Sequence, residues 1–219
     1  RFNEIKNKKE LKIMSVGCGP CTELAAVDYL KAQGVLNFEK LQYRGIDPLE
    51  GVWKHIWNDV REYYGDGIQF YPKDILQLVD IIVKHSWVPD VLIFQYVFSD
   101  MYKHSDEEEI IQFINKLADF LNSYEEKSIY ILCNDINLTK SKGGGREFFD
   151  ILESKINKPK IVKKRHFDNI NRERHYEYGE QYNSNVLVFD DISDEIKNAY
   201  SPFESCASAQ ILIKRERKK

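Results

Sequence analysis

Short apolar runs alternate along the chain with longer segments in which apolar residues recur every three or four positions. A short apolar run bounded by turn residues is typical of a buried strand, and the three-to-four spacing is typical of a helix with one apolar face. The pattern predicts strands at residues 11–16, 42–46, 68–71, 91–96, 128–133, 160–167, 185–189 and 209–214. It predicts helices at residues 22–31, 52–64, 75–85 and 146–156.

A capping motif predicts a further helix. Ser105 and Glu108 have the spacing of a capping box, in which each side chain hydrogen-bonds the backbone N–H of the other residue. The apolar positions within residues 110–121 form a face broad enough to be largely buried. Residues 97–104, before this cap, are predicted to be a polar loop, and residues 134–145 are predicted to be a second one.

Strands that alternate with helices indicate a doubly wound, mostly parallel sheet with helices on both faces. The unbroken apolar character of residues 91–94 supports this prediction, because a central parallel strand is buried on both sides. A chain of 219 residues has the size of one domain, so we expect a single domain over residues 1–219.

The end of the first predicted strand carries the most informative motif. The apolar run that ends at Val16 is followed by Gly17, Cys18 and Gly19, and a helical pattern begins shortly afterwards. Glycine permits a tight turn and lets a ligand contact the main chain, and the next helix offers free N–H groups to an anion. This order of strand, turn and helix indicates a nucleotide or nucleoside site.

Polar residues also follow the next strands. Asp47 closes the second strand, where a carboxylate suits the two hydroxyls of a ribose. Asp74 follows the third strand, and Gln95 and Tyr96 close the fourth. Because ligands of open α/β sheets bind at the carboxyl ends of the strands, we expect these side chains to share one site.

This ordered set of motifs resembles the class I S-adenosylmethionine-dependent methyltransferases over about residues 10–215. The resemblance implies a Rossmann-like sheet that ends in antiparallel strands, S-adenosyl-L-methionine as the cofactor, and methyl transfer as the reaction. It also implies that the glycine loop, with Gly17, Cys18 and Gly19, faces the methionine part of the cofactor.

The same resemblance implies a role for each of the other strand ends. Asp47 matches the acidic residue that holds the ribose, and Asp74 matches the polar residue that bonds the adenine amino group. Gln95 and Tyr96 match the positions beside the sulfonium.

Two positions depart from the family pattern. The family usually has an acidic residue where Ser15 stands, so Ser15 bears on how the cofactor's amino group is held. It usually has a third glycine where Cys21 stands, and Pro20 beside it stiffens the turn. We include Ser15 among the cofactor-binding candidates.

The competing interpretation of the glycine loop is NAD binding. The NAD fingerprint requires a third glycine, and Thr22 occupies that position. It also places its acidic residue about 20 residues beyond the loop, and Asp47 lies farther away than that. Both facts count against NAD, which stays the alternative cofactor.

The candidate catalytic residues lie at the mouth of the predicted site. Methyl transfer requires the acceptor atom within about 3–3.5 Å of the methyl carbon, and a base only where the acceptor must lose a proton. The candidates are Tyr96, Asp100, His104 and Asp135. Tyr96 could stack on a planar acceptor. Alternatively, Asp100 and His104 are exposed loop residues and Asp135 turns the backbone.

Two further features carry open alternatives. Trp53 and Trp57 stand one turn apart on a predicted helix and pack either in the core or against adenine. The loop 140–146 combines three glycines with Lys140, Lys142 and Arg146. It either closes over an acceptor and contacts phosphate, or is a mobile surface loop.

Composition leaves the acceptor open. Hydrophobic residues make up 42% of the chain and charged residues 31%, which is ordinary for a globular protein. The net charge of −3 gives no overall attraction to nucleic acid, but residues 158–175 are strongly basic and contain aromatic residues, as in segments that bind phosphates and bases. We therefore expect RNA as the acceptor. The alternatives are a small molecule, a protein, or a methyltransferase-like binding protein without activity.

The cysteines and the apolar segments bear on metal, redox state and location. Cys18 and Cys21 form a C-x-x-C motif, but no second pair completes a zinc site, so we expect no metal. With Cys133 and Cys206 they are too few to be a disulfide framework. No membrane-spanning run or secretory leader is visible, so we expect a cytoplasmic protein with no membrane partner.

Overall fold

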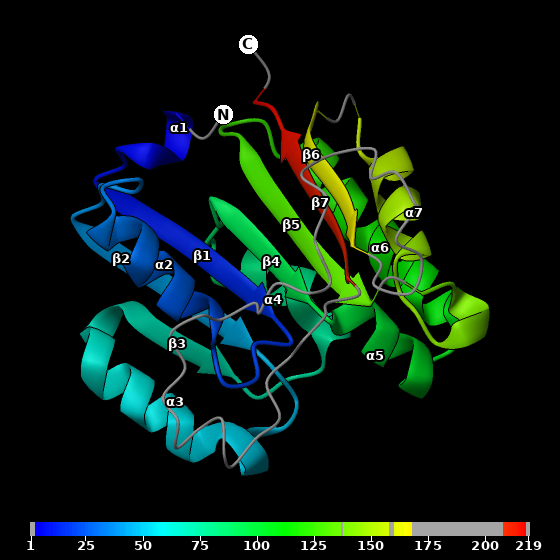
Figure 1. The fold of residues 1–219 in the computed structure, drawn as a ribbon, viewed down its shortest axis with the longest axis horizontal. Helices are drawn as coiled ribbons and strands as arrows, with labels where there is room; N and C mark the ends of the chain where they lie inside the picture. The colour runs from blue at the N-terminus through cyan, green and yellow to red at the C-terminus, as the bar shows by residue number, and fades with distance from the viewer. Residues whose placement is uncertain (1–2, 137, 158–159, 168–207, 218–219) are drawn as a thin grey trace.

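The residues that the structure describes, 3–136, 138–157, 160–167 and 208–217, form one seven-stranded sheet in a computed structural model (Figure 1). The order across the sheet is β3-β2-β1-β4-β5-β7-β6. The strands are β1 (Glu10–Val16), β2 (Lys40–Ile46), β3 (Ile68–Tyr71), β4 (Val91–Gln95), β5 (Ile129–Ile136), β6 (Lys160–Phe167) and β7 (Ser208–Arg215).

Helices connect most of these strands. They are α1 (Asn3–Lys6), α2 (Glu23–Ala32), α3 (Glu50–Tyr64), α4 (Leu78–Lys84), α5 (Val97–His104), α6 (Glu107–Ser123) and α7 (Glu147–Lys155). Short 3-10 turns lie at η1 (Gly65–Gly67), η2 (Ile75–Gln77) and η3 (Lys140–Lys142). The predicted strand at residues 185–189 lies outside the described residues.

The sheet is parallel from β3 to β5 and antiparallel beyond. β1 pairs in parallel with β2 and β4, β2 with β3, and β4 with β5. β7 pairs antiparallel with both β5 and β6. The chain winds outward from β1 to β3 and then crosses to β4, so the strand order reverses between β1 and β4. The predicted doubly wound sheet with antiparallel C-terminal strands is confirmed.

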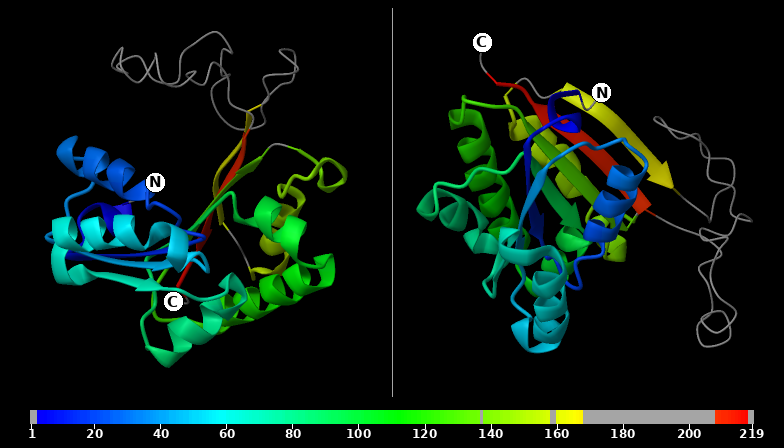
Figure 2. Two further views of the ribbon diagram at one scale, coloured as in Figure 1. Left: turned by 90° about the horizontal axis from the view of Figure 1, so that it is seen from below. Right: turned by 90° about the vertical axis from the view of Figure 1, so that its left-hand side faces the viewer.

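Two apolar clusters lie on opposite faces of the sheet. One is built with α4, α5, α6 and α7, and the other with α1, α2 and α3. Figure 2 shows helices on both sides of the strands. Burial of strand residues on both faces explains the continuous apolar pattern of Leu92, Ile93 and Phe94, which are at most 7% exposed.

Helix α5 replaces the polar loop predicted at residues 97–104. The apolar residues Val97, Phe98 and Met101 are buried on its inner side, as expected for a helix of three-to-four spacing. The prediction failed because the first apolar residues of this helix, Val97 and Phe98, follow the apolar run of β4 after only Gln95 and Tyr96, so they resemble an extension of the strand. The turn between them depends on one residue, Tyr96, whose backbone is left-handed.

The capping box predicted at Ser105 and Glu108 is wrong by one residue. Helix α6 has Asp106 as its N-cap, and no side chain caps it. Ser105 instead ends α5, because its backbone N–H donates to the carbonyl of Met101 at 2.7 Å. The predicted broad apolar face of α6 is buried, as expected.

Strand β5 continues three residues beyond its predicted end, so Asn134, Asp135 and Ile136 belong to the strand and not to a loop. Pairing with β7 extends it, since these residues lie opposite residues 208–210. Two of the three glycines of the loop that follows, Gly144 and Gly145, are closely packed, whereas Gly143 has open space around it. A Cβ on Gly144 would lie 1.9 Å from the carbonyl oxygen of Leu138. The loop therefore needs glycine for close contact.

Candidate functional site

The polar strand ends predicted to share a site all lie at the carboxyl edge of the parallel strands. Gly17 follows β1, Asp47 follows β2, Asp74 follows β3, and Tyr96 follows β4. In Figure 1 the arrowheads of β1, β4 and β5 point toward this edge. It includes the reversal of strand order between β1 and β4, where open α/β sheets bind their ligands.

The glycine loop is fixed to the end of β2 by backbone hydrogen bonds. The N–H groups of Gly17 and Cys18 both donate to the carbonyl of Ile46, at 2.8 and 3.2 Å. The N–H of Gly19 donates to the carboxylate of Asp47 at 3.0 Å. The loop is therefore held on the neighbouring strand by contacts within the protein, which require no ligand.

Left-handed backbone explains the residue types of this loop. Gly17 has φ +62°, Gly19 has φ +46° and Cys21 has φ +62°. Glycine adopts this region without the steric cost that a side chain brings. Cys21, which stands where the family usually has a third glycine, thus retains the conformation that a glycine would have. Gly17 also lacks space, since a Cβ there would lie 2.9 Å from Cγ2 of Val97.

Asp47 joins the glycine loop to the start of α3. One carboxylate oxygen accepts the N–H of Gly19, and the other accepts the N–H of Leu49 at 2.9 Å. The residue is 7% exposed. A carboxylate oxygen has two lone pairs, so each still has acceptor capacity for a ligand hydroxyl.

The two tryptophans of α3 have different surroundings. Trp57 is buried, stacks on Phe70 with centroids 4.8 Å apart, and donates its indole N–H to the carbonyl of Gly19 at 2.9 Å. Trp57 belongs to the core and supports the loop through this hydrogen bond. Trp53 is half-buried, and a Cβ on Gly19 would lie 3.8 Å from its ring. Trp53 is thus the tryptophan that borders the loop surface.

Ser15 and Cys18 are both buried. Ser15 is 2% exposed and lies between Gly45 of β2 and Ile93 of β4. Gly45 makes room for the thiol of Cys18, because a Cβ on Gly45 would lie 2.6 Å from that sulfur. Contact with the thiol of Cys21, together with burial, raises the pKa of Cys18 well above its ordinary value. Cys18 is therefore an unreactive thiol that packs the loop.

Asp74 is exposed and caps the η2 turn. Its Oδ1 accepts the N–H of Leu76 at 2.8 Å. The exposed carboxylate lies just beyond the end of β3, so its second oxygen is placed to accept a donor from a ligand over this edge.

Tyr96 combines a left-handed backbone with an exposed ring. Its φ is +58°, and the residue is 43% exposed. Its N–H donates to the carbonyl of Asn134 at 2.7 Å. Gln95, the last residue of β4, is half-buried and lies opposite Asn134 in β5. The two sequence candidates at this strand end are thus adjacent to the mouth of the site.

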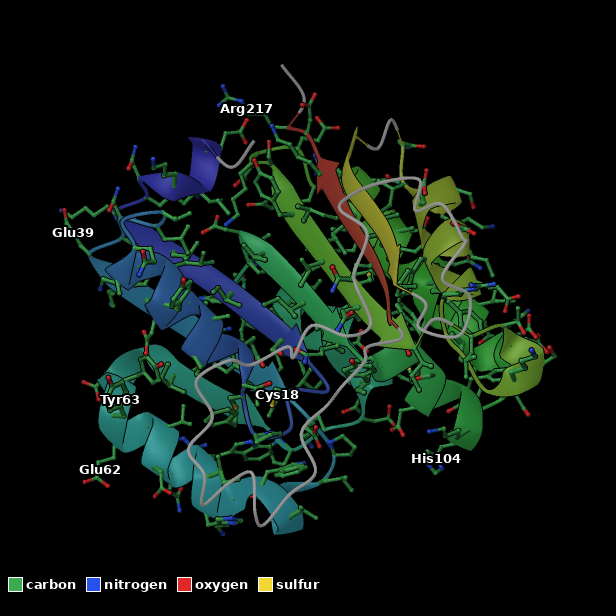
Figure 3. All side chains as sticks on the ribbon, viewed as in Figure 1. Cys18, Glu39, Glu62, Tyr63, His104 and Arg217 are labelled. Carbon is green, nitrogen blue, oxygen red and sulfur yellow. The ribbon has the colours of Figure 1, made fainter. Side chains whose placement is uncertain are left out.

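Asp100 and His104 lie on the outer side of α5. Their side chains are 67% and 75% exposed, and His104 Nε2 lies 3.8 Å from Asp100 Oδ1. Figure 3 shows His104 directed outward and well separated from Cys18 of the glycine loop. The structure does not bring these two residues together with the cofactor-binding candidates.

Asp135 is completely buried, at 0% exposure. Its Oδ2 accepts the N–H of Ser99 at 2.9 Å, and its Oδ1 accepts the N–H of Ile136 at 2.7 Å. Burial raises the pKa of this carboxyl group, although the hydrogen bonds from Ser99 oppose the rise. With both oxygens bound to backbone and none exposed, Asp135 is not presented to an acceptor.

Comparison with known proteins identifies solved structures with the same fold, but no match in sequence. No family model and no curated protein matches the sequence. Among solved structures, a candidate class I S-adenosylmethionine-dependent methyltransferase from Listeria monocytogenes matches with a TM-score of 0.51 and 14% identity over 99% of this chain and 57% of that one. The chain has the fold of the class I methyltransferases. A possible exported protein from Bordetella parapertussis matches at 0.51 and 9% identity, over 99% of this chain and 65% of that one.

Within this methyltransferase fold, the sequence motifs identified the strand ends but missed several supports. The carbonyl of Ile46, the indole of Trp57 and the methyl groups of Val97 hold the glycine loop through contacts that no local pattern encodes. Asn134 lies opposite Gln95 in β5, and its side-chain Oδ1 is buried without a hydrogen-bond partner.

The described residues contain no group of three or more His, Cys, Asp or Glu side chains placed to hold a metal ion. No helix in the described part of the chain combines the length and apolar character needed to cross a membrane. Lys140 of the 140–146 loop is paired with Glu107 of α6 and lies over the ring of Phe148. The positive charge of Lys140 is therefore partly neutralised within the protein.

Proposed function

We propose that the protein is an S-adenosylmethionine-dependent methyltransferase. The observation that carries the proposal is the glycine loop after β1, which is hydrogen-bonded to Ile46 and Asp47 at the reversal of strand order. Such a loop exposes backbone to a ligand where ligands of this sheet type bind. The shared fold supports the same function.

The donor and acceptor groups at the strand ends fit S-adenosylmethionine. Gly17 and Gly19 present main chain without side chains to the amino acid part, next to Ser15 and Cys18. Asp47 retains acceptor capacity for the ribose hydroxyls. The exposed carboxylate of Asp74 is available to an amino group such as that of adenine.

The residues at the end of β4 would lie beside the reacting atoms. The bound cofactor supplies a methyl group on a positively charged sulfur. Tyr96, with its exposed ring, would orient the acceptor, and Gln95 would border the same space. Holding the acceptor in line supplies several kcal/mol of the barrier without a base. We do not place Asp100, His104 or Asp135 in contact with the acceptor, because the first two lie on the outer side of α5 and the third is completely buried.

The cofactor assignment is tested by calorimetric titration with S-adenosylmethionine, its demethylated product S-adenosylhomocysteine, and NAD. We expect micromolar binding of the first two and no binding of NAD. Asp47→Ala should weaken binding by about 1–3 kcal/mol, roughly 5- to 150-fold, because ribose hydroxyls and the loop N–H lose their acceptor. Asp66→Ala, an exposed change in η1, is the control. NAD binding alone would show that the cofactor is misassigned.

RNA is the acceptor that we propose. β6 forms the edge of the sheet among the described residues, and it contains Lys163, Lys164 and Arg165. The rest of the basic stretch lies mostly outside the described residues. Replacing Lys163 and Lys164 with glutamate should reduce binding to a mixed cellular RNA fraction and flatten its salt dependence, because phosphate contacts release counterions. Unchanged binding would favour a small-molecule acceptor.

The remaining alternative is a binding protein without activity. It arises because Ser15 and Cys21 depart from the family pattern. The left-handed backbone at Cys21 supports an intact loop, and so supports turnover. Incubation with labelled S-adenosylmethionine and fractions of RNA, protein and metabolites should label one fraction. Cofactor binding with no labelled fraction would favour the inactive protein.

A further inference from the structure

Tyr96 occupies a costly conformation at the place where an acceptor would lie. A residue other than glycine with φ +58° costs of order 1–3 kcal/mol and persists only when its surroundings fix it. The residue is 43% exposed at the end of β4. The contacts that fix Tyr96 therefore determine where its ring points.

Those contacts converge on the first turn of α5. Tyr96 is the N-cap residue of α5, and its side chain does not cap the helix. An N-cap side chain ordinarily accepts the N–H of the second or third helical residue. Ser99 is the third residue of α5, and its N–H is accepted by Asp135, which lies 36 residues away in β5. Asp135 thus supplies from another strand the cap that Tyr96 cannot supply.

Neighbouring residues pack closely around the hydrogen bond between Ser99 and Asp135 and connect it to the glycine loop. Gly145 packs so closely that a Cβ on it would lie 2.4 Å from the Ser99 nitrogen and 2.7 Å from Asp135 Oδ2. On the other side of the turn, Val97 fills the space that a side chain on Gly17 would need. The residue before Asp135, Asn134, accepts the N–H of Tyr96. The turn is therefore held from β5 and pressed against the cofactor loop.

We propose that Asp135 is a positioning residue that holds the first turn of α5, and through it sets the ring of Tyr96 against the methyl acceptor. The proposal deepens the proposed function and rests on it for its effect on rate. It replaces the role of base expected for Asp135 from its place after the fifth strand. A carboxylate with 0% exposure and two bound backbone N–H groups acts on the reaction only through what it holds.

The variant Asp135→Asn isolates this role. An amide has one oxygen and no charge, so in either orientation the charge-assisted hydrogen bond to Ser99 is weakened or lost, and the NH₂ group faces the N–H of Ser99 or that of Ile136. Asp119→Asn on the exposed side of α6 is the matched control. In the ligand-free protein, the amide of Ser99 should exchange with solvent about tenfold faster in Asp135→Asn than in the wild type. Unchanged exchange would overturn the proposal whether or not the protein is a methyltransferase.

A second measurement tests the link to Tyr96. The labelled-methyl rate at saturating cofactor should fall about 10- to 100-fold in Asp135→Asn, as for a displaced reacting group, while affinity for S-adenosylhomocysteine stays within about twofold. Tyr96→Ala should lower the rate too, and the double variant should be no slower than the slower single variant. Additive losses, or a wild-type rate in Asp135→Asn, would overturn the proposal. Absence of cofactor binding in the wild type would instead overturn the proposed function.

Discussion

Cys21 shows how one residue can depart from a family pattern and keep its geometry. Its φ of +62° lies in the region that favours glycine, and its thiol is buried against the same loop. The side chain contributes packing, while the backbone bears a steric cost. Cys18, three positions earlier, shares the burial but not the left-handed backbone.

This difference in backbone conformation predicts that the glycine and alanine variants have opposite orders of stability at positions 21 and 18. Where alanine fits the native backbone without strain, glycine is less stable than alanine by roughly 0.4–1 kcal/mol, because the unfolded glycine chain has more conformational freedom to lose. At position 21 we expect Cys21→Gly to be more stable than Cys21→Ala by about 1 kcal/mol, because only glycine relieves the left-handed strain. At position 18 we expect the ordinary order. Urea unfolding of the four variants measures both differences. The same order at both positions would contradict the strain at Cys21.

At the scale of elements, Asp90 ties three strands together at the amino edge of the sheet, opposite the site. The residue is 1% exposed and precedes β4. Its carboxylate accepts the N–H of Lys12 from β1 at 2.9 Å and the ammonium groups of Lys8 and Lys127 at 2.7 Å each. Burial opposes ionisation, but these hydrogen bonds prevail and lower the pKa of Asp90.

The cluster predicts a pH-dependent effect of Asp90→Asn. Near pH 7 the substitution should reduce the free energy of unfolding by about 2–3 kcal/mol, because it leaves two part-buried ammonium groups without a counter-charge. A lowered carboxyl pKa stabilises the fold above the unfolded value of about 3.9, and the contribution is lost as pH falls through the folded pKa. The difference between wild type and variant should therefore shrink below about pH 4.

A surface pair provides the control for this measurement. Asp80 of α4 pairs with Lys116 of α6 at 2.7 Å, but their side chains are 64% and 47% exposed. Asp80→Asn should cost less than about 1 kcal/mol, since water and salt screen exposed pairs. Equal losses in the two variants, measured by urea unfolding, would show that burial does not strengthen the Asp90 cluster.

The elements also show how far local sequence reaches. The predicted strand 68–71 and the β3 bounds coincide, and predicted helix 22–31 differs from α2 by one residue at each end. Glycine, proline and apolar spacing encode such elements within a few residues. Helix α5 and the last three residues of β5 were not predicted, because the first depends on Asp135 and the second on pairing with β7.

At the scale of the whole molecule, the two sides of the candidate site come from distant parts of the chain. The glycine loop is held by β2, and Tyr96 is held by β5. A cofactor lying over the reversal between β1 and β4 would contact both sides. Binding should therefore stabilise the sheet as a unit, and not only the loop.

This linkage predicts a thermal shift. At a concentration of S-adenosylhomocysteine 100 times its dissociation constant, the folded state gains about 2.7 kcal/mol, and the midpoint of unfolding should rise by roughly 5–10 °C. Scanning fluorimetry with and without the ligand measures the shift. In Asp47→Ala the shift should be smaller at the same ligand concentration. An equal shift in the variant would show that Asp47 does not contribute to the bound state.

The sequence by itself determined the order of the elements, the mostly parallel sheet, and the placement of Gly17, Asp47, Asp74 and Tyr96 at strand ends. Those features follow from periodicity and from residue types at turns, which act over a few positions. Only the tertiary structure decided which carboxylates face a ligand and which serve the protein. Asp100 and Asp135 are the same residue type near the ends of the neighbouring strands β4 and β5, yet one is 67% exposed and the other 0%. Burial and hydrogen bonding between residues far apart in the chain set that difference, and no local pattern records them.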